Sequence, residues 1–199
     1  MTADGAPEPV RLTAEQARKL QEKHQLKRLT KSAESGRIGM NDRFYKEGDD
    51  PMFTAFGRAE DSNPKELAEL QARLTTIGVG FEHHDEEDAA LAYQNTQVGK
   101  PGSISVTPNA SYSAWLHEAK HAFDDFEAGW NACLAVWDVE EHIRREINAY
   151  QEEIDYAVSL SRQDIAKQLE QLRDDEIAEI RRRDEEYARL YEIYGEGGT

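Results

Sequence analysis

The chain of 199 residues carries 40 acidic and 24 basic side chains, a formal net charge of −16, and 38% of its residues are hydrophobic. This length fits one domain with extensions, or at most two small domains. Because the acidic excess repels phosphate, we expect no nucleic-acid partner and no membrane partner. The single cysteine, Cys133, excludes an internal disulfide and any metal or redox site of the CxxC type.

The chain shows no sign of a targeting or membrane-spanning segment. No stretch approaches the roughly 20 consecutive apolar residues that span a bilayer. The N-terminal sequence MTADGAPEPV lacks the basic and apolar regions of a signal peptide. We therefore expect a protein that is cytoplasmic as synthesised, with non-classical export left open.

Residues 1–62 are predicted to form an N-terminal helix followed by an irregular arm. Thr13 and Gln16 have the spacing of a capping box, which predicts a helix that runs to about Ser35. Residues 36–63 are rich in Gly, Asp, Asn and Pro, and we expect them to form an irregular connection.

The next segment alternates helix and strand signals. Asn63 and Pro64 suit the cap and the first position of a helix, which predicts a helix over 64–75. Residues 76–81 favour a short strand. Alternating apolar side chains predict a second strand at 104–106.

Three further helices are predicted, over 110–127, 138–160 and 162–194. The apolar positions of the last helix are too irregular for a coiled coil. We expect it to fold back on the preceding helix as a hairpin, with a helix-mediated dimer as the alternative. These boundaries divide the remainder into a core, 63–160, and a long charged C-terminal helix, 161–199.

The predicted helix over 110–127 contains the motif H-E-x-x-H, here HEAKH. His117 and His121 project from one side of the helix, one turn apart, where two neutral imidazoles can bind one Zn²⁺. Glu118 lies beside them and can polarise a zinc-bound water. Because the apolar stripe of the helix lies opposite, we expect the histidines to face a cleft or solvent. Two solvated histidines that bind nothing are the alternative.

A catalytic zinc site needs a third protein ligand, which leaves one coordination position open for water. The candidates are Glu140, Glu141, Glu146, Glu153, Asp124 and Asp125. Rotation by about 100° per residue turns Glu141 away from the apolar face of its helix and places Glu153 toward the margin of that face. The same rotation does not separate Glu146 from Glu140.

Other polar residues near the motif have candidate roles. Asp124 and Asp125 share the helix of the histidines, so we expect them to orient a ligand histidine through its other ring nitrogen, with solvated carboxylates as the alternative. Tyr150 is a candidate for stabilising the oxyanion of a tetrahedral intermediate. His142 precedes Glu146 by one helical turn and is a candidate contact of the site, although a solvated helix residue is the more common outcome.

The runs GKPGSISVTPNASYSAWLHEAKHAFDD and RREINAYQEEIDYA carry a resemblance to known proteins. HExxH followed by a Glu on a later helix resembles the gluzincin-type zinc metallopeptidases. The two runs together are more closely similar to the zincin-like metallopeptidase toxin domains of bacterial polymorphic toxins, over residues 76–160. The resemblance implies His117, His121 and Glu146 as zinc ligands and Glu118 as general base. The family pattern, unlike the helix rotation, selects Glu146.

Together these features predict an α+β, mostly helical fold, with a small β-sheet packed on the HExxH helix and long N- and C-terminal helices. The predicted function is zinc-dependent hydrolysis of peptide bonds in a peptide or protein substrate, as in a bacterial toxin or effector protease. An immunity or inhibitor protein is a further partner left open.

The net charge of −16 supports an alternative of another class. An acidic interaction protein, such as an inhibitor or a nucleic-acid mimic, would carry the same motif as an incidental or structural metal site. A third hypothesis is an inactive relative of a peptidase that keeps zinc for stability alone.

Overall fold

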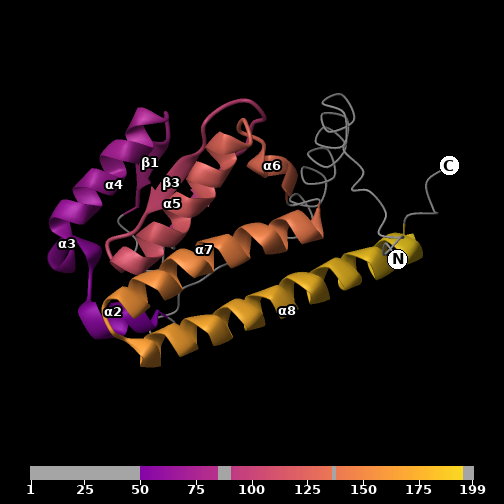
Figure 1. The fold of residues 1–199 in the computed structure, drawn as a ribbon. Coiled ribbons are helices and arrows are strands. Elements are labelled where there is room, and N and C mark those ends of the chain that lie inside the picture. The colour runs from indigo at the N-terminus through magenta and orange to yellow at the C-terminus, as the bar shows by residue number, and fades with distance from the viewer. Residues whose placement is uncertain (1–49, 85–90, 136–137, 195–199) are drawn as a thin grey trace, which may run out of the picture. The chain divides into compact units, whose positions relative to one another are not determined.

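The computed structural model describes residues 50–84, 91–135 and 138–194, all within the unit Arg43–Thr199. Figure 1 shows the arrangement of the elements. In chain order they are α2 (Pro51–Phe56), α3 (Ala59–Ser62), α4 (Pro64–Thr76), β1 (Gly80–His83), β2 (Ala92–Gln94), β3 (Ser103–Val106), α5 (Tyr112–Glu127), α6 (Ala132–Ala135), α7 (Val139–Ser159) and α8 (Gln163–Tyr194). The N-terminal helix predicted from Thr13 lies outside the described residues.

The predicted fold class is confirmed, because the described residues are mostly helical and form one small mixed sheet. The four helices predicted between residues 64 and 194 are present as α4, α5, α7 and α8, with ends within two residues of the prediction. Polar side chains cap the N-termini of α5 and α7. Ser111 accepts a hydrogen bond from the backbone of Ala114 on α5, and Asp138 accepts one from Glu141 on α7.

The irregular connection predicted over residues 36–63 is wrong for its described part, which contains the short helices α2 and α3. Asp50 begins α2 because its carboxylate accepts two backbone N–H groups of the first turn, and Pro51 takes the first helical position. Asn63 stands at the predicted cap of α4, but its side chain accepts a hydrogen bond from the Tyr156 hydroxyl instead.

The strand predicted at residues 76–81 begins later than expected. α4 continues through Thr76, and the hydroxyls of Thr75 and Thr76 bond to backbone carbonyls one turn earlier, at 2.8 and 2.9 Å. Those bonds accommodate two β-branched residues in the last helical turn. The chain then turns at Gly78, whose φ of 94° suits glycine, and β1 begins at Gly80.

β3 is the central strand of the sheet, whose order is β1-β3-β2. It pairs in parallel with β1, where Phe81 is opposite Ile104, and antiparallel with β2, where Tyr93 is opposite Ile104. Ile104 is fully buried, as the alternating pattern predicts. With Leu74 of α4 and Trp115 of α5 it belongs to one hydrophobic cluster, which is the larger core of the fold.

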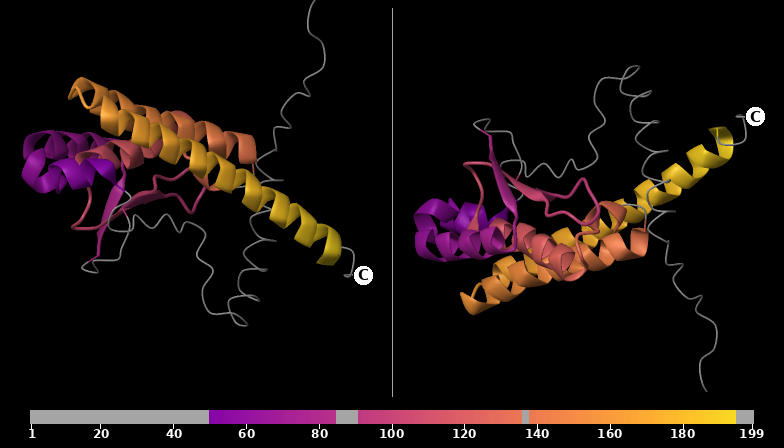
Figure 2. Two further views of the ribbon diagram at one scale, coloured as in Figure 1. Left: turned by 90° about the horizontal axis from the view of Figure 1, so that it is seen from below. Right: turned by 90° about the horizontal axis from the view of Figure 1, so that it is seen from above.

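The helix that carries the HEAKH motif, α5, is covered on two sides. Its apolar side chains, including the buried Ala119 and Ala122, join the sheet and α4 in the larger core. Its other side packs along α7. Figure 2 shows the sheet and the α7–α8 pair on opposite sides of α5. The motif therefore lies inside the fold rather than at its margin.

α8 runs back along α7, which confirms the predicted helical hairpin. The chain reverses at Ser161, which has a φ of 59°, and the backbone N–H of Arg162 then bonds to the carbonyl of Ala157 at 2.9 Å. The hairpin and α2 enclose a second apolar cluster, made of Met52, Tyr150, Ile154, Ala157, Ile165, Ala166 and Leu169. None of the described helices combines the length and the apolar composition that a membrane span requires. The helix-mediated dimer stays a prediction.

Replacing Leu169 tests whether α8 is part of the folded core. Leu169 is 2% exposed in the second cluster, so Leu169→Ala should lower the free energy of unfolding by about 2–5 kcal/mol in urea denaturation. Leu160, at the turn, is 40% exposed, and Leu160→Ala should cost less than about 1 kcal/mol. Equal effects of the two substitutions would show that α8 does not pack as described.

Candidate metal centre

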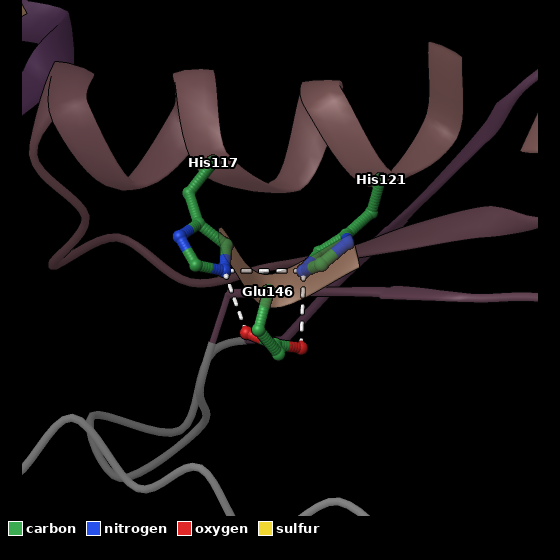
Figure 3. A group of neighbouring side chains, drawn as sticks. All are labelled: His117, His121 and Glu146. Atoms are coloured by element: carbon green, nitrogen blue, oxygen red, sulfur yellow. Dashed lines mark hydrogen bonds and ion pairs between the residues drawn. The ribbon is translucent and has the colours of Figure 1, made fainter. Parts of the chain in front are cut away.

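Three side chains from two helices meet between α5 and α7. Figure 3 shows His117 and His121 of α5 pointing toward Glu146 of α7. The Nε2 atoms of the two histidines are 3.1 Å apart. The Glu146 carboxylate lies 3.5 Å from Nε2 of His117 through Oε2 and 3.4 Å from Nε2 of His121 through Oε1.

The spacing of these atoms fits a metal ion. A tetrahedral zinc ion with bonds of about 2.0–2.1 Å holds its ligand atoms about 3.3–3.4 Å apart. The two Nε2 atoms are 3.1 Å apart, and each lies 3.4 or 3.5 Å from a different oxygen of the Glu146 carboxylate, so each of these separations is close to that value. Among the described residues, His117, His121 and Glu146 form the group that can hold a metal. Glu140, which helix rotation left as an equal candidate, is exposed and is not in this group.

The burial of the histidines differs from the expectation that they face a cleft or solvent. His117 is fully buried, and only the side chain of His121 reaches the surface, with 16% exposed. The predicted helical rotation is correct for Trp115, Ala119 and Ala122, which belong to the core that includes the sheet, whereas Phe126 is exposed. The pattern of one helix does not show where a second helix packs. In the structure, α7 covers the side of α5 that carries the two histidines.

Glu153 of α7 contacts the second ring nitrogen of His117, a position that the sequence analysis missed. It is 1% exposed, and its Oε1 lies 2.7 Å from Nδ1 of His117. Its Oε2 accepts a hydrogen bond from the hydroxyl of Ser113 at 2.9 Å. A carboxylate at Nδ1 favours the proton there and leaves the Nε2 lone pair for a metal. The available signal was the spacing of Glu146 and Glu153, which places them two turns apart on one helix face.

Asp124 and Asp125 were expected to orient a ligand histidine, and for the buried histidine that prediction is wrong. The carboxylate at its second nitrogen is Glu153, because α7 and not α5 faces that atom. Asp124 accepts hydrogen bonds from Lys120 and Asn148, at 2.7 and 3.1 Å. Asp124 thereby links α5 to α7 beside the centre.

Asp125 holds β2 against α5. Its Oδ2 accepts a hydrogen bond from the Tyr93 hydroxyl at 2.7 Å. Burial, together with the hydrogen bond to Asp125 and its charge, raises the pKa of Tyr93, which stays a neutral donor. Gly102 donates its backbone N–H to the same hydroxyl, and any side chain there would collide with the Tyr93 ring and the carbonyl of Gln94. These contacts determine where β2 runs along α5.

Glu118, the expected general base, is buried between α5 and β2. Its Oε2 accepts a hydrogen bond from the backbone N–H of Tyr93 at 2.7 Å. A strand residue directs its N–H and C=O to the same edge, so Tyr93 presents both to the side of β2 away from β3. Glu118 therefore lies where the outer edge of β2 meets the helix of the two histidines.

Tyr150 and His142 of α7 both contact the three-residue group. The Tyr150 ring meets the ring of His117 edge to face, with centroids 5.0 Å apart. Tyr150 is 4% exposed, and its role at an oxyanion stays a prediction. Nε2 of His142 lies 3.7 Å from Oε1 of Glu146, so His142 contacts the site, which the sequence analysis treated as the less common outcome.

Comparison of the chain with models of known protein families, with curated proteins and with solved structures returns no match. The resemblance to zincin-like metallopeptidases is thus carried by the motif and its spacing. Independently of it, the fold brings the two motif histidines and the downstream Glu146 together.

Substitution of Glu153 tests its support of His117. Glu153→Gln keeps the shape and one acceptor but removes the charge beside the imidazole, so zinc affinity should fall about 10–100-fold in a competition titration. Glu152→Gln, at the exposed neighbouring position, removes the same charge from the helix and should leave the affinity unchanged. Equal affinities of the two variants would contradict the assigned role of Glu153.

Proposed function

We propose that the protein is a zinc-dependent peptidase whose metal is held by His117, His121 and Glu146. The observation that carries the proposal is the convergence of three potential ligand atoms, all within 4.8 Å of one another, from an HExxH helix and a glutamate of a second helix. Bound there, zinc would polarise the scissile carbonyl and lower the pKa of a water molecule to about 7.

Glu118 is the residue that would move the proton in this reaction. Hydrolysis of a peptide bond adds the oxygen of water to the carbonyl carbon and delivers a proton to the leaving amine. The Glu118 carboxylate follows His117 directly in the chain and is fixed in orientation by its bond to the Tyr93 N–H. It would accept the proton of the attacking water and pass it to the amine.

The outer edge of β2 supports a peptide as the substrate. An extended peptide that pairs with a sheet edge gains main-chain hydrogen bonds. At this edge the Tyr93 N–H is already bonded to Glu118, so a peptide beside Glu118 would pair with the carbonyl of Tyr93. The net charge of −16 favours a basic peptide over an acidic one. By its resemblance, the protease would be of the bacterial toxin or effector type, with an immunity or inhibitor protein as a natural partner.

An acidic interaction protein stays the alternative function. The negative charge that motivates this alternative is partly compensated by arginine side chains. On α8, Glu179 bonds to Arg182 and Arg183, and Asp174 bonds to Arg173. Carboxylates paired within their own helix offer less negative potential to a basic partner. An inactive protein that keeps zinc for stability is separated from the peptidase by the two experiments below.

Glu118→Gln tests the proposed chemistry. The variant should bind zinc as the parent protein does, and its kcat/KM on a mixed peptide library should fall about 10²–10⁴-fold, the usual contribution of a general base. New peptide N-termini are counted by mass spectrometry. Glu127→Gln, an exposed carboxylate at the end of the same helix, is the control and should keep full activity. Activity retained by Glu118→Gln would rule out this mechanism.

Removal of the metal tests the site itself. At free zinc of 100 times Kd, binding should stabilise the fold by about 2.7 kcal/mol, so a chelator should lower the Tm of the parent protein. His121→Ala removes a partly exposed ligand and should abolish most of that shift. The metal site is refuted if the zinc-reconstituted protein holds less than about a tenth of an equivalent, since such sites bind zinc tightly.

A further inference from the structure

Asp125 of α5 is a fully buried carboxylate that accepts hydrogen bonds from several parts of the fold. Its Oδ2 accepts one from the Tyr93 hydroxyl at 2.7 Å and one from the side-chain amide of Asn95 at 2.6 Å. Its Oδ1 accepts one from the backbone N–H of Ala132 at 2.6 Å, and a guanidinium nitrogen of Arg145 lies 3.9 Å from the same oxygen. Because a buried charge that loses a donor is destabilised, these contacts hold the carboxylate in one place.

Tyr93 links this carboxylate to Glu118, the proposed general base. The Tyr93 hydroxyl is bonded to Asp125, and the Tyr93 backbone N–H is bonded to Oε2 of Glu118 at 2.7 Å. Glu118 and Asp125 are seven residues apart on α5, so they lie on one side of the helix, two turns from each other. Tyr93 therefore spans two turns of α5, and its bond to Asp125 determines where its N–H meets Glu118.

The sheet by itself provides β2 with limited support. β2 has three residues, Ala92–Gln94, and pairs with β3 at an edge of the sheet. A strand of this length makes few main-chain bonds to its neighbour, so its contacts with α5 contribute to its position. We propose that Asp125 is a positioning residue, which acts through Tyr93 to hold the Glu118 carboxylate in the orientation that proton transfer requires.

This inference rests on the proposed function, because that function makes Glu118 the general base. A simpler explanation is that Asp125 stabilises the fold by joining β2 and α6 to α5, with no effect on Glu118. The two explanations differ in whether the bond between the Tyr93 N–H and Glu118 survives when the Tyr93 hydroxyl is removed.

Nuclear magnetic resonance of the full-length, zinc-reconstituted protein tests this bond directly. Tyr93→Phe removes the hydroxyl and keeps the ring and the backbone N–H. The amide proton signal of residue 93 should then move toward its position in Glu118→Ala, which lacks the acceptor, and its hydrogen exchange should become at least about tenfold faster. Tyr156→Phe removes a hydroxyl that bonds to Asn63 at 3.2 Å, so it is the matched control and should leave this amide unchanged.

Asp125→Asn tests the other end of the link. It puts a donor in place of one acceptor oxygen, where the surrounding groups are themselves donors, and it should move the amide signal of Tyr93 in the same direction. Tyr93→Phe leaves the carboxylate with its other donors, so it decides the result if Asp125→Asn does not fold.

Kinetics on one peptide that the parent protein cleaves test the consequence for catalysis. Misplacing a reacting group by about 1 Å can cost about 10²-fold, so kcat of Tyr93→Phe should fall about 10–100-fold while its zinc affinity stays that of the parent protein. In a protein that already carries Glu118→Gln, Tyr93→Phe should lower kcat by less than about twofold more, because it acts through Glu118.

The outcomes separate this inference from the proposed function. An unchanged amide of residue 93 in Tyr93→Phe, or a change confined to KM, would overturn the role of Asp125 and leave the peptidase intact. A parent protein that cleaves no peptide would overturn the proposed function and the catalytic part of this inference. The amide of residue 93 would still show whether Asp125 holds Glu118 in place.

Discussion

The packing of His117 of α5 against α7 is the contact on which the rest of the centre depends. Its imidazole is fully buried, with Nδ1 2.7 Å from Glu153 and Nε2 3.5 Å from Glu146. One side chain thus joins the motif helix to two positions of α7 that are two turns apart. The same contact turns Nε2 of His117 toward His121, and it leaves the apolar side of α5 for the sheet.

The burial of Glu153 and Glu146 beside His117 costs free energy of folding unless the carboxylate charges are compensated. Glu153 is 1% exposed and Glu146 9%, and an uncompensated buried charge costs about several kcal/mol. Glu153 is compensated by Ser113 and His117. A divalent cation between the helices would bind the Nε2 atoms of His117 and His121, which lie 3.1 Å apart and can otherwise share only one proton. The spacing of the ligand atoms and the chemistry of the two imidazoles therefore favour the same occupant.

Local patterns predicted most of the fold, and contacts between elements account for the rest. Caps and periodicity are properties of one segment, so α4, α5, α7 and α8 and the pair His117 and His121 could be located from the sequence. Helix rotation could not choose between Glu146 and Glu140, because the choice depends on how α7 is rotated against α5. The role of Glu153 and the bond from Tyr93 to Glu118 arise in the same way, from the packing of separate elements.

The central claim, that His117, His121 and Glu146 hold a metal, is tested most directly by a crystal structure of the zinc-reconstituted protein with anomalous diffraction on both sides of the zinc edge. The account predicts one anomalous peak between α5 and α7, about 2.0–2.1 Å from Nε2 of both histidines and from a carboxylate oxygen of Glu146. A peak at another place, or none between these helices, would contradict it.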